Sequence, residues 1–346
     1  HDVVLKKTGG RCRIYAPVGA HGDLLAYLVR RLLENGANSS FVNQLVNKSV
    51  EAKTIAEDPF LRFSNDLPPK ELFRPADIYG DGRKNSKGFD LSDEQTLFDI
   101  IKHRKLKLPA AVPLTLTKPT GRSKLAFNPA TKQVIGNVME ADESTVLRAI
   151  SDASIWNISV GERIKVLRRT ADLYEENAGL FFATLTQEAG KTIPDAVGEI
   201  REAVDFLRYY AQQAEVLISE PRGLFAAISP WNFPLAIFTG QVAAALVAGN
   251  GVLAKPADQT PIISYIAVQL MHQAGVPVAA LQLLLGPGNT VGSMLTKNVR
   301  ICGMVFTGSN NTAKRIRLSM AQFLPVNAPL IAETGGLNAM IIDSTA

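Results

Sequence analysis

The sequence predicts an α/β protein built on a doubly wound parallel sheet. Short apolar runs alternate with helical segments through the second half of the chain, at the spacing that β-α-β units require. The longest apolar stretch, Gly223 to Ala254, carries no charged residue, but prolines and asparagines interrupt it. A transmembrane helix would leave those polar groups in lipid, so a strand, a buried helix and a second strand explain the stretch better.

The C-terminal half contains the first β-α-β unit and its repeats. That unit consists of a strand over Leu224–Ile228, a turn, a buried helix over Pro234–Ala248 and a strand over Gly251–Ala254. Periodicity then predicts helices over Thr260–Ala274, Thr290–Leu295 and Ser309–Gln322, and strands over Leu281–Leu285, Met304–Thr307 and Leu330–Ala332. Sheets of this kind bind ligands at the carboxyl ends of their strands.

Upstream of the sheet the chain changes character. Helical periodicity with charged outer faces predicts helices over Ser144–Ile155, Val160–Glu176, Ala178–Gly190 and Pro194–Leu217. Residues 47–118 are rich in Pro, Lys and Asp and show little periodicity, which indicates a linker or an extended surface covering. Before them, Arg11–Gly19 is predicted as a strand and Asp23–Asn35 as a helix that Gly36 closes.

Composition argues against several classes of protein. The chain has 346 residues, 46% of them hydrophobic, which is enough for two or three domains. Lysine and arginine number 37 against 32 for aspartate and glutamate, and the excess is spread out, so nucleic-acid binding gains little support. Cys12 and Cys302 are the only cysteines, and no Cys or His stands at metal-ligand spacing. We therefore expect a reducing compartment, without a disulfide framework or a metal site.

The two ends do not look like natural termini. The chain begins with HDVVLKK, without a Met or the charged-then-apolar leader of a signal peptide. It stops at IIDSTA, directly after a strand-like run. We expect a piece of a longer protein.

Two polar residues mark the ends of the first two strands. The amide of Asn232 could donate a hydrogen bond to an oxyanion that develops at the strand end, or it could cap the helix that follows. Lys255 ends a buried strand, where a lysine is costly unless its ammonium leaves the core or finds a partner. A dinucleotide ribose is one such partner, and the alternative is a surface lysine.

Two later strands also end in candidate site residues. Gly308 permits close approach of the backbone, and Ser309 begins a helix whose free N–H groups favour a phosphate, a role compatible with plain capping. Glu333 precedes two glycines, the usual pattern for a carboxylate that projects into a cleft, although an ion pair is the alternative. No GxGxxG motif is present, because the run from Gly286 to Gly292 has one residue too many.

A second set of candidates lies near the N-terminus. Tyr27, Arg30 and Arg31 are spaced so that they share one face of the predicted helix. Two guanidinium groups on one face suit a substrate carboxylate. The alternative is an amphipathic docking helix with solvated arginines.

Longer motifs carry a resemblance to known families. ISPWNFP, GNGVLAKPADQTP, VFTGSNNTAKR and AETGGLNAMIIDST resemble the cofactor-binding half of the aldehyde dehydrogenases. Within that superfamily, REAVDFLRYYA, AKPADQTP and AETGGLNAMI are most similar to the glutamate-semialdehyde (pyrroline-5-carboxylate) dehydrogenases. RIYAPVGAHGDLLAYLVRRLLENGANSSFVNQ resembles the last strand and helix of a (β/α)8 proline dehydrogenase barrel, and DIYGDGRKNSKGFDL resembles the connector after it. Their order is similar to that of the bifunctional proline-catabolic flavoenzymes.

This resemblance implies a domain plan and a function. It implies the end of the barrel over 1–47, the connector over 48–117 and the NAD-binding part of the aldehyde dehydrogenase module over 118–346. The implied reactions are oxidation of L-proline to pyrroline-5-carboxylate with FAD and of L-glutamate γ-semialdehyde to L-glutamate with NAD. The partners would be these small molecules, with no nucleic acid bound by this segment. A homo-oligomer, a cytoplasmic location and peripheral contact with a membrane quinone pool are also implied.

The resemblance also implies roles for individual residues. Asn232 would supply the oxyanion hydrogen bond, and Glu333 would be the base that activates water for thioester hydrolysis. Lys255 and Asp258 would bind the adenosine ribose, although the family usually has Glu at the second position. The remaining cofactor contacts would come from Ser229, Trp231, Gly288, Gly292, Gly308, Ser309 and Gly335. Tyr15, Tyr27, Arg30 and Arg31 would bind proline.

Some of these assignments leave alternatives open. Trp231 suits a protein core as well as a cofactor cleft. Asn310 and Asn311 replace the family's usual Thr-Glu, which puts contacts beyond Ser309 in doubt. The catalytic cysteine of the family lies downstream of Ala346, and Cys302 is expected to be a small buried hydrophobe, so the chain alone should bind cofactor weakly and oxidise no aldehyde. A non-catalytic scaffold and a general aldehyde dehydrogenase are the rival functions, and the second leaves the N-terminal motifs unexplained.

Overall fold

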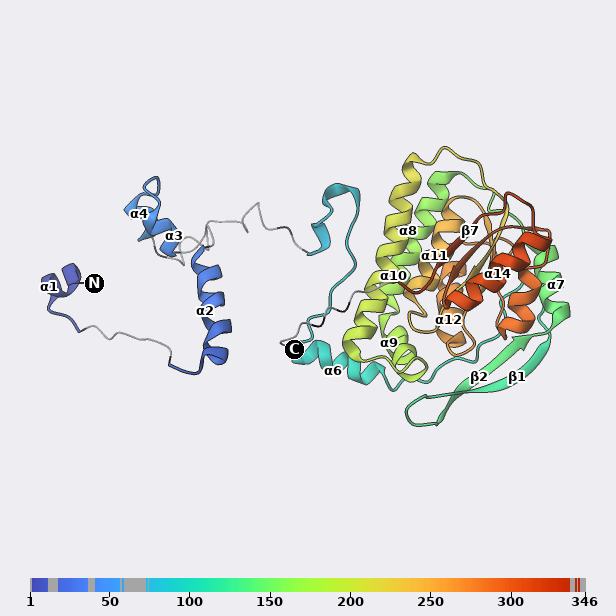
Figure 1. The fold of residues 1–346 in the computed structure, drawn as a ribbon, viewed down its shortest axis with the longest axis horizontal. Helices are drawn as coiled ribbons and strands as arrows, with labels where there is room; N and C mark the ends of the chain where they lie inside the picture. Colours follow the sequence, from blue (N-terminus) through green and yellow to red (C-terminus); the bar gives the residue numbers. More distant parts are fainter. Residues whose placement is uncertain are drawn as a thin grey trace. The chain divides into compact units, whose positions relative to one another are not determined.

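The computed structural model describes residues 2–11, 18–36, 41–56, 58, 73, 75–336, 340 and 342. The chain divides into two compact units, His1–Leu72 and Phe73–Ala346, and both are drawn in Figure 1. Most of the predicted strand Arg11–Gly19, with Tyr15 and Cys12, lies outside the described residues.

The first unit is helical in its described part. Its helices are α1 (Asp2–Thr8), α2 (His21–Gly36), α3 (Phe41–Val46) and α4 (Ala52–Ile55). The helix predicted over Asp23–Asn35 is confirmed as α2, which starts slightly earlier and includes Gly36 rather than ending before it. Leucines and valines on α2 remain exposed within this unit, namely Leu25, Leu28, Val29, Leu32 and Leu33.

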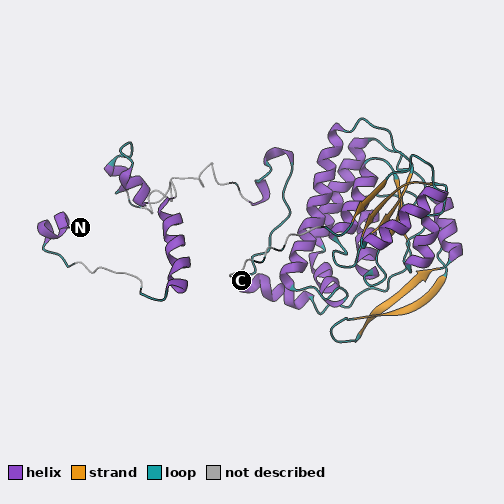
Figure 2. Ribbon diagram, viewed as in Figure 1, coloured by secondary structure: helices purple, strands orange, loops and turns teal. Residues whose placement is uncertain are grey.

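A parallel sheet organises the second unit. Its five strands lie in the order β5-β4-β3-β6-β7. They are β3 (Leu224–Ile228), β4 (Gly251–Lys255), β5 (Leu281–Leu283), β6 (Ile301–Thr307) and β7 (Leu330–Glu333). All four strand pairings are parallel. Figure 2 shows these strands as one orange layer among the helices. The predicted α/β architecture and the five strands predicted for the C-terminal half are confirmed.

Helices cover both faces of this sheet. Alternate residues of β3 separate into two cores, with Phe225 and Ala227 in one and Leu224 and Ala226 in the other. The larger core contains residues of α8 (Val160–Glu176), α9 (Ala178–Gln187), α10 (Ile193–Gln213), α11 (Ala236–Val247) and α12 (Pro261–Ala274). The smaller core contains residues of α7 (Glu143–Asp152), α13 (Ser293–Leu295) and α14 (Asn310–Phe323). The sheet is therefore doubly wound, as predicted.

Several elements were not predicted. An antiparallel hairpin joins β1 (Gly121–Phe127) to β2 (Val134–Ala141), and β1 is mostly exposed and polar, so it lacks an apolar signal. Helix α6 (Glu94–His103), capped by Asp93, lies inside the segment interpreted as a linker. The helix predicted over Thr290–Leu295 is a π-helical turn, η4 (Gly288–Gly292), followed by α13. The remaining short turns are η1 (Pro75–Asp77), η2 (Gly80–Gly82) and η3 (Ala214–Val216).

The sequence argues against a transmembrane helix over Gly223 to Ala254, because prolines and asparagines interrupt this apolar stretch. In the described part of the chain, no helix combines the length and the apolar character needed to cross a bilayer. The apolar stretch in question forms β3, α11 and β4, whose residues are almost all buried in the sheet and the core beside it.

Candidate functional site

The strand register places the predicted site residues along one edge of the sheet. Ile228 pairs with Lys255 and with Phe306, and Thr307 pairs with Glu333. The carboxyl ends of β3, β4, β6 and β7 are therefore level. Because neighbouring strands lie about 4.8 Å apart, the end of β7 is roughly 10 Å from the end of β3.

Lys255 is buried at the end of β4, with only 4% of its surface exposed. Its Nζ donates to the carbonyl oxygen of Pro256 at 2.9 Å and to Oδ1 of Asp258 at 2.8 Å. Burial lowers the pKa of Lys255, and the nearby Asp258 carboxylate opposes that shift. The surface-lysine alternative is therefore wrong, and the partner that keeps the ammonium inside is Asp258.

A cleft of about 580 Å³ opens beside this ion pair. It brings together four predicted residues: Lys255, Asp258, Gly288 and Gly292. A side chain at Gly292 would approach Cδ of Lys255 to 3.8 Å, so glycine leaves the space beside the lysine open. A lysine ammonium has three hydrogens, and among the described residues only two acceptors are found for that of Lys255. One donor remains for a ligand in the cleft.

Sequence reasoning missed most of the polar lining of this cleft. The missed residues are Gln259, Asn289, Ser293, Thr296, Lys297, Thr312, Arg315 and Ser319. Three of them, Thr312, Arg315 and Ser319, recur along α14 at the spacing of one helical face. This polar face is the signal in the sequence that could have indicated the lining of the cleft. A polar helix face is ordinarily solvated, however, so it does not by itself indicate a site.

The turn after β3 presents Asn232 and Trp231 outward. Helix α11 begins at Ala236, and no side chain caps it within its own turn, so the capping alternative for Asn232 is wrong. The side chain of Asn232 is exposed, and that of Trp231 is 58% exposed, which rules out a core role for Trp231 in this structure. Ser229 is buried, and its hydroxyl has no partner among the residues described.

The ends of β6 and β7 lie next to each other. The Gly308 N–H donates to the carbonyl oxygen of Glu333 at 3.1 Å. The Glu333 side chain is exposed and forms no ion pair with any described residue, so the structure gives no support to the ion-pair alternative. Ser309 accepts a hydrogen bond from the Thr312 N–H at 3.2 Å and caps α14, which confirms the capping role. Gly335 lies just beyond β7 and does not line the cleft.

Cys302 lies near the amino-terminal end of β6, away from the carboxyl ends of the strands. It is the second residue of β6, so its distance along the strand from Thr307 is roughly 16 Å. Its Sγ would contact a side chain placed at Gly223, just before β3 begins. The expectation of a buried cysteine is wrong, because Cys302 is half-buried. Its position excludes it as a nucleophile at the carboxyl edge.

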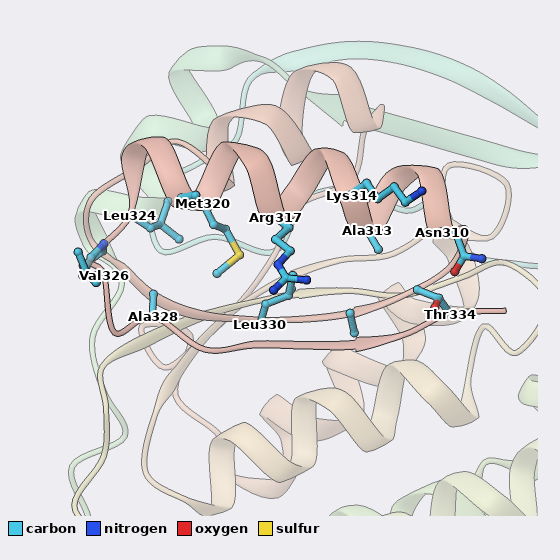
Figure 3. A pocket seen from close by; sticks show the side chains of 13 residues that line it. Asn310, Ala313, Lys314, Arg317, Met320, Leu324, Val326, Ala328, Leu330 and Thr334 are labelled. Atoms are coloured by element: carbon cyan, nitrogen blue, oxygen red, sulfur yellow. The ribbon is translucent and has the colours of Figure 1, made fainter. Parts of the chain in front are cut away.

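A larger hollow runs between α14 and β7, as Figure 3 shows. Its volume is about 820 Å³. The lining is mainly apolar near Met320, Leu324 and Leu330, and Asn310 and Thr334 lie at its polar end. None of the predicted site residues lines it. The smaller cleft, which holds the buried Lys255 and its partner Asp258 at the strand ends, is therefore the better candidate site.

In the first unit, α2 carries the predicted arginines. Arg31 pairs with Glu34 at 2.7 Å, and Arg30 lies 3.8 Å from the same carboxylate oxygen. The Arg31 guanidinium also lies over the Tyr27 ring, 5.4 Å from its centre. The three predicted residues thus share one face, as the spacing implied. Tyr15 lies outside the described residues, so its place beside them is untested.

The fold and the cleft define a class of protein, and comparisons with known proteins define the family. A doubly wound sheet with a ligand cleft at its strand ends is the arrangement of dinucleotide-binding α/β enzymes. The aldehyde dehydrogenase family model matches residues 117–346, and the proline dehydrogenase model matches residues 1–44. The chain belongs to the aldehyde dehydrogenase family and begins with a segment of proline dehydrogenase type.

Individual relatives match all or part of this chain. The bifunctional protein PutA of Klebsiella aerogenes is 45% identical over 97% of this chain. A 1-pyrroline-5-carboxylate dehydrogenase of Anoxybacillus flavithermus is 35% identical over 64% of this chain and 48% of its own length. A crystal structure of a mutant proline utilization A from Bradyrhizobium japonicum matches all of this chain and 35% of its own, with a TM-score of 0.82 and 38% identity. The chain spans 27% of the length of the Klebsiella protein.

Proposed function

We propose that this chain is a central part of a bifunctional proline-catabolic enzyme. One reaction oxidises L-proline to pyrroline-5-carboxylate with FAD, and the other oxidises L-glutamate γ-semialdehyde to L-glutamate with NAD. Two family models in this order support the proposal, as do relatives named bifunctional protein PutA and 1-pyrroline-5-carboxylate dehydrogenase. We propose the domain limits 1–47, 48–117 and 118–346 on the same grounds. A general aldehyde dehydrogenase leaves the proline dehydrogenase match unexplained.

The cleft beside Lys255 is the observation that carries the NAD assignment. Its volume is about 580 Å³, and the lysine keeps one ammonium hydrogen for a ribose hydroxyl. Asp258 would share the ribose and neutralise the lysine. Gly288 and Gly292 line the cleft without side chains and so leave room for the cofactor. Ser309, at the start of α14, would face a phosphate. Ser229, Trp231, Gly308 and Gly335 complete the proposed contacts. Bound NAD would accept a hydride from the substrate.

The turn after β3 and the end of β7 would act on the aldehyde. The Asn232 amide is exposed at the carboxyl edge, where it can donate to an oxyanion as charge develops. Glu333 ends β7 with an exposed carboxylate, which would take a proton from the water that releases the acid. Cys302 cannot supply the thiol that this chemistry needs, because it lies near the amino-terminal end of β6. By the family resemblance, we propose that this thiol lies downstream of Glu333.

The first unit would bind proline. Arg30 and Arg31 offer two guanidinium groups on one exposed helix face, and Glu34 offsets part of their charge. The proline carboxylate would take the place of Glu34 on at least one of them. Tyr15 and Tyr27 are proposed to shape the same pocket. FAD is proposed from the family match alone, and no described residue is assigned to hold it.

The test uses the full-length protein. We expect NAD reduction that depends on glutamate semialdehyde, and reduction of an artificial electron acceptor that depends on proline. A protein that binds NAD but catalyses neither reaction would support the scaffold function instead. Sedimentation and membrane fractionation test the proposed homo-oligomer, the cytoplasmic location and the contact with a quinone pool.

A further inference from the structure

Two glutamates are buried near the junction of α9 and α10. Glu188 directly follows α9 and is 5% exposed, and Glu199 lies on α10 and is 1% exposed. Burial raises the pKa of both carboxyls, that of Glu188 to about 8. A buried carboxyl is costly unless it is hydrogen-bonded, so the partners of these two indicate their role.

Each glutamate accepts hydrogen bonds from the start of a different helix. Glu199 Oε2 accepts from the N–H groups of Leu235 at 3.3 Å and Ala236 at 2.9 Å, where α11 begins. Glu188 accepts from Ile262 at 2.7 Å and Ile263 at 2.9 Å, at the first N–H groups of α12 after Pro261. Neither helix has a side-chain cap of its own. The two glutamates therefore cap these helices from outside.

Both helices follow a connection that carries proposed site residues. The connection from β3 to α11 presents Asn232, and the connection from β4 to α12 presents Asp258. The strands fix the start of each connection in the sheet. The glutamates fix the end, within a few residues of the functional side chain.

Lys191 also contacts the connection from β3 to α11. Its Nζ lies 3.2 Å from Glu199 Oε1 and 4.3 Å from the centre of the Phe233 ring, next to Asn232 in sequence. Gly190, with a φ of +67°, makes the left-handed bend that brings Lys191 back toward α9. The backbone N–H of Lys191 donates to the carbonyl oxygen of Leu185 at 3.1 Å. This hydrogen bond ties the residue after the bend to the last turn of α9.

We propose that Glu199, together with Lys191, positions the turn that presents Asn232, and that Glu188 positions the loop that presents Asp258 beside Lys255. These are positioning residues, because none of the three lines the cofactor cleft. The inference rests on the proposed NAD-dependent aldehyde oxidation. It assigns the two glutamates to different steps: Glu199 to chemistry and Glu188 to cofactor binding.

The test compares Glu199→Gln with Glu188→Gln in the full-length enzyme. In Glu188→Gln the amide keeps one acceptor and turns a donor toward the second N–H group. In Glu199→Gln the new NH2 group faces either the two N–H groups or the Lys191 ammonium, because one oxygen of Glu199 accepts from both N–H groups and the other faces Lys191. We expect Glu199→Gln to lower kcat for aldehyde oxidation by about 10- to 100-fold, because a donor displaced by a fraction of an ångström stabilises the oxyanion poorly. The Kd of Glu199→Gln for NAD should stay within about twofold of the wild-type value. That change in binding free energy is well below the value for a tenfold change, about 1.4 kcal/mol.

Glu188→Gln is the matched variant, because it removes the same kind of cap from the neighbouring helix. We expect it to raise the Kd for NAD about fivefold or more and to leave kcat at saturating NAD nearly unchanged, as loss of a cofactor-binding contact alone would do. A third comparison adds Asn232→Ala. If Glu199 acts through Asn232, the double variant should be no slower than Asn232→Ala alone.

The outcomes separate a failed inference from a failed function. Wild-type enzyme without semialdehyde-dependent NAD reduction would overturn the proposed function. If the wild type is active, the inference would be overturned by a parallel loss of kcat and NAD affinity in both variants that follows the fall in their melting temperatures. The inference would also be overturned if the double variant lowered kcat by the product of the two single-variant effects, because the two residues would then act independently. If Glu199→Gln does not fold, Lys191→Met provides the same test, with proline oxidation by the same polypeptide as the folding control.

Discussion

Lys255 shows how a charged side chain is retained in a core at the residue scale. A buried ammonium needs partners, and Asp258 with the Pro256 carbonyl supplies two of them at under 3 Å. Asp258 remains 35% exposed, so water screens this pair and its direct contribution to stability is small. The pair is better explained by what it offers the cleft, a fixed donor beside a carboxylate.

Replacing Lys255 with Met should weaken cofactor binding and leave the fold intact. Methionine fills a similar volume, whereas the lost charged hydrogen bond should raise the Kd for NAD about tenfold, which corresponds to about 1.4 kcal/mol. Fluorescence titration of the full-length protein measures this change. The matched control is Lys314→Met, which removes a lysine from the other hollow on α14. Equal losses of affinity in both variants would contradict the assignment.

Replacing Glu333 with Gln should separate chemistry from binding. An amide cannot take a proton from water, so steady-state aldehyde oxidation by the full-length enzyme should fall by about 10²-fold or more. NAD binding should be nearly unchanged, since Glu333 does not line the cleft beside Lys255. Steady-state turnover and NAD titration provide the two measurements. Unaltered turnover would remove Glu333 from the mechanism.

At the scale of elements, the Glu188 carboxyl links the end of α9 to the start of α12, and it should make stability depend on pH. Burial raises its pKa from 4.5 to about 8, so the folded protein holds a proton that the unfolded chain has released between these values. The free energy of unfolding should therefore fall as pH rises from 4.5 to 8, by up to about 1.4 kcal/mol per pH unit.

Urea unfolding of wild type and Glu188→Gln between pH 5 and 8 measures this contribution. The difference between the two isolates Glu188 from the carboxyls whose pKa is lowered, such as Asp142 and Glu140, which act at lower pH and with the opposite sign. We expect wild type to lose stability relative to the variant as pH rises. A difference that does not change with pH would show that Glu188 titrates normally.

At the scale of the whole molecule, the two compact units are proposed to carry different reactions. Replacing Arg30 with Met in the full-length protein should therefore raise the KM for proline, by about tenfold for one charged hydrogen bond. Oxidation of glutamate semialdehyde should be unaffected. Steady-state assays of both reactions on one preparation make the comparison. Equal loss of both activities would indicate that Arg30 supports folding instead.

The sequence predicted the sheet well because its strands are continuous apolar runs separated by clear helix signals. It failed at β1, where exposed polar residues give no apolar pattern. It also failed at α6, although Leu97, Phe98, Ile100 and Ile101 form a visible apolar pattern after the Asp93 cap, because that pattern is short and lies in a segment rich in Pro, Lys and Asp. It also overlooked Glu199, although an acid on the apolar stripe formed by Ala196, Ile200 and Ala203 was a visible signal. A buried acid identifies no partner by itself, since that partner lies on another helix.

The sequence by itself determined the α/β class, the order of the elements and most proposed site residues, because these depend on local periodicity and short motifs. Only the tertiary structure decided which of those residues meet. It placed Lys255 and Asp258 in one cleft with Gly288 and Gly292, put Cys302 near the amino-terminal end of β6, and joined two buried glutamates to distant helices. Such contacts follow from strand order and register, which bring together residues far apart in the chain and which no local pattern specifies.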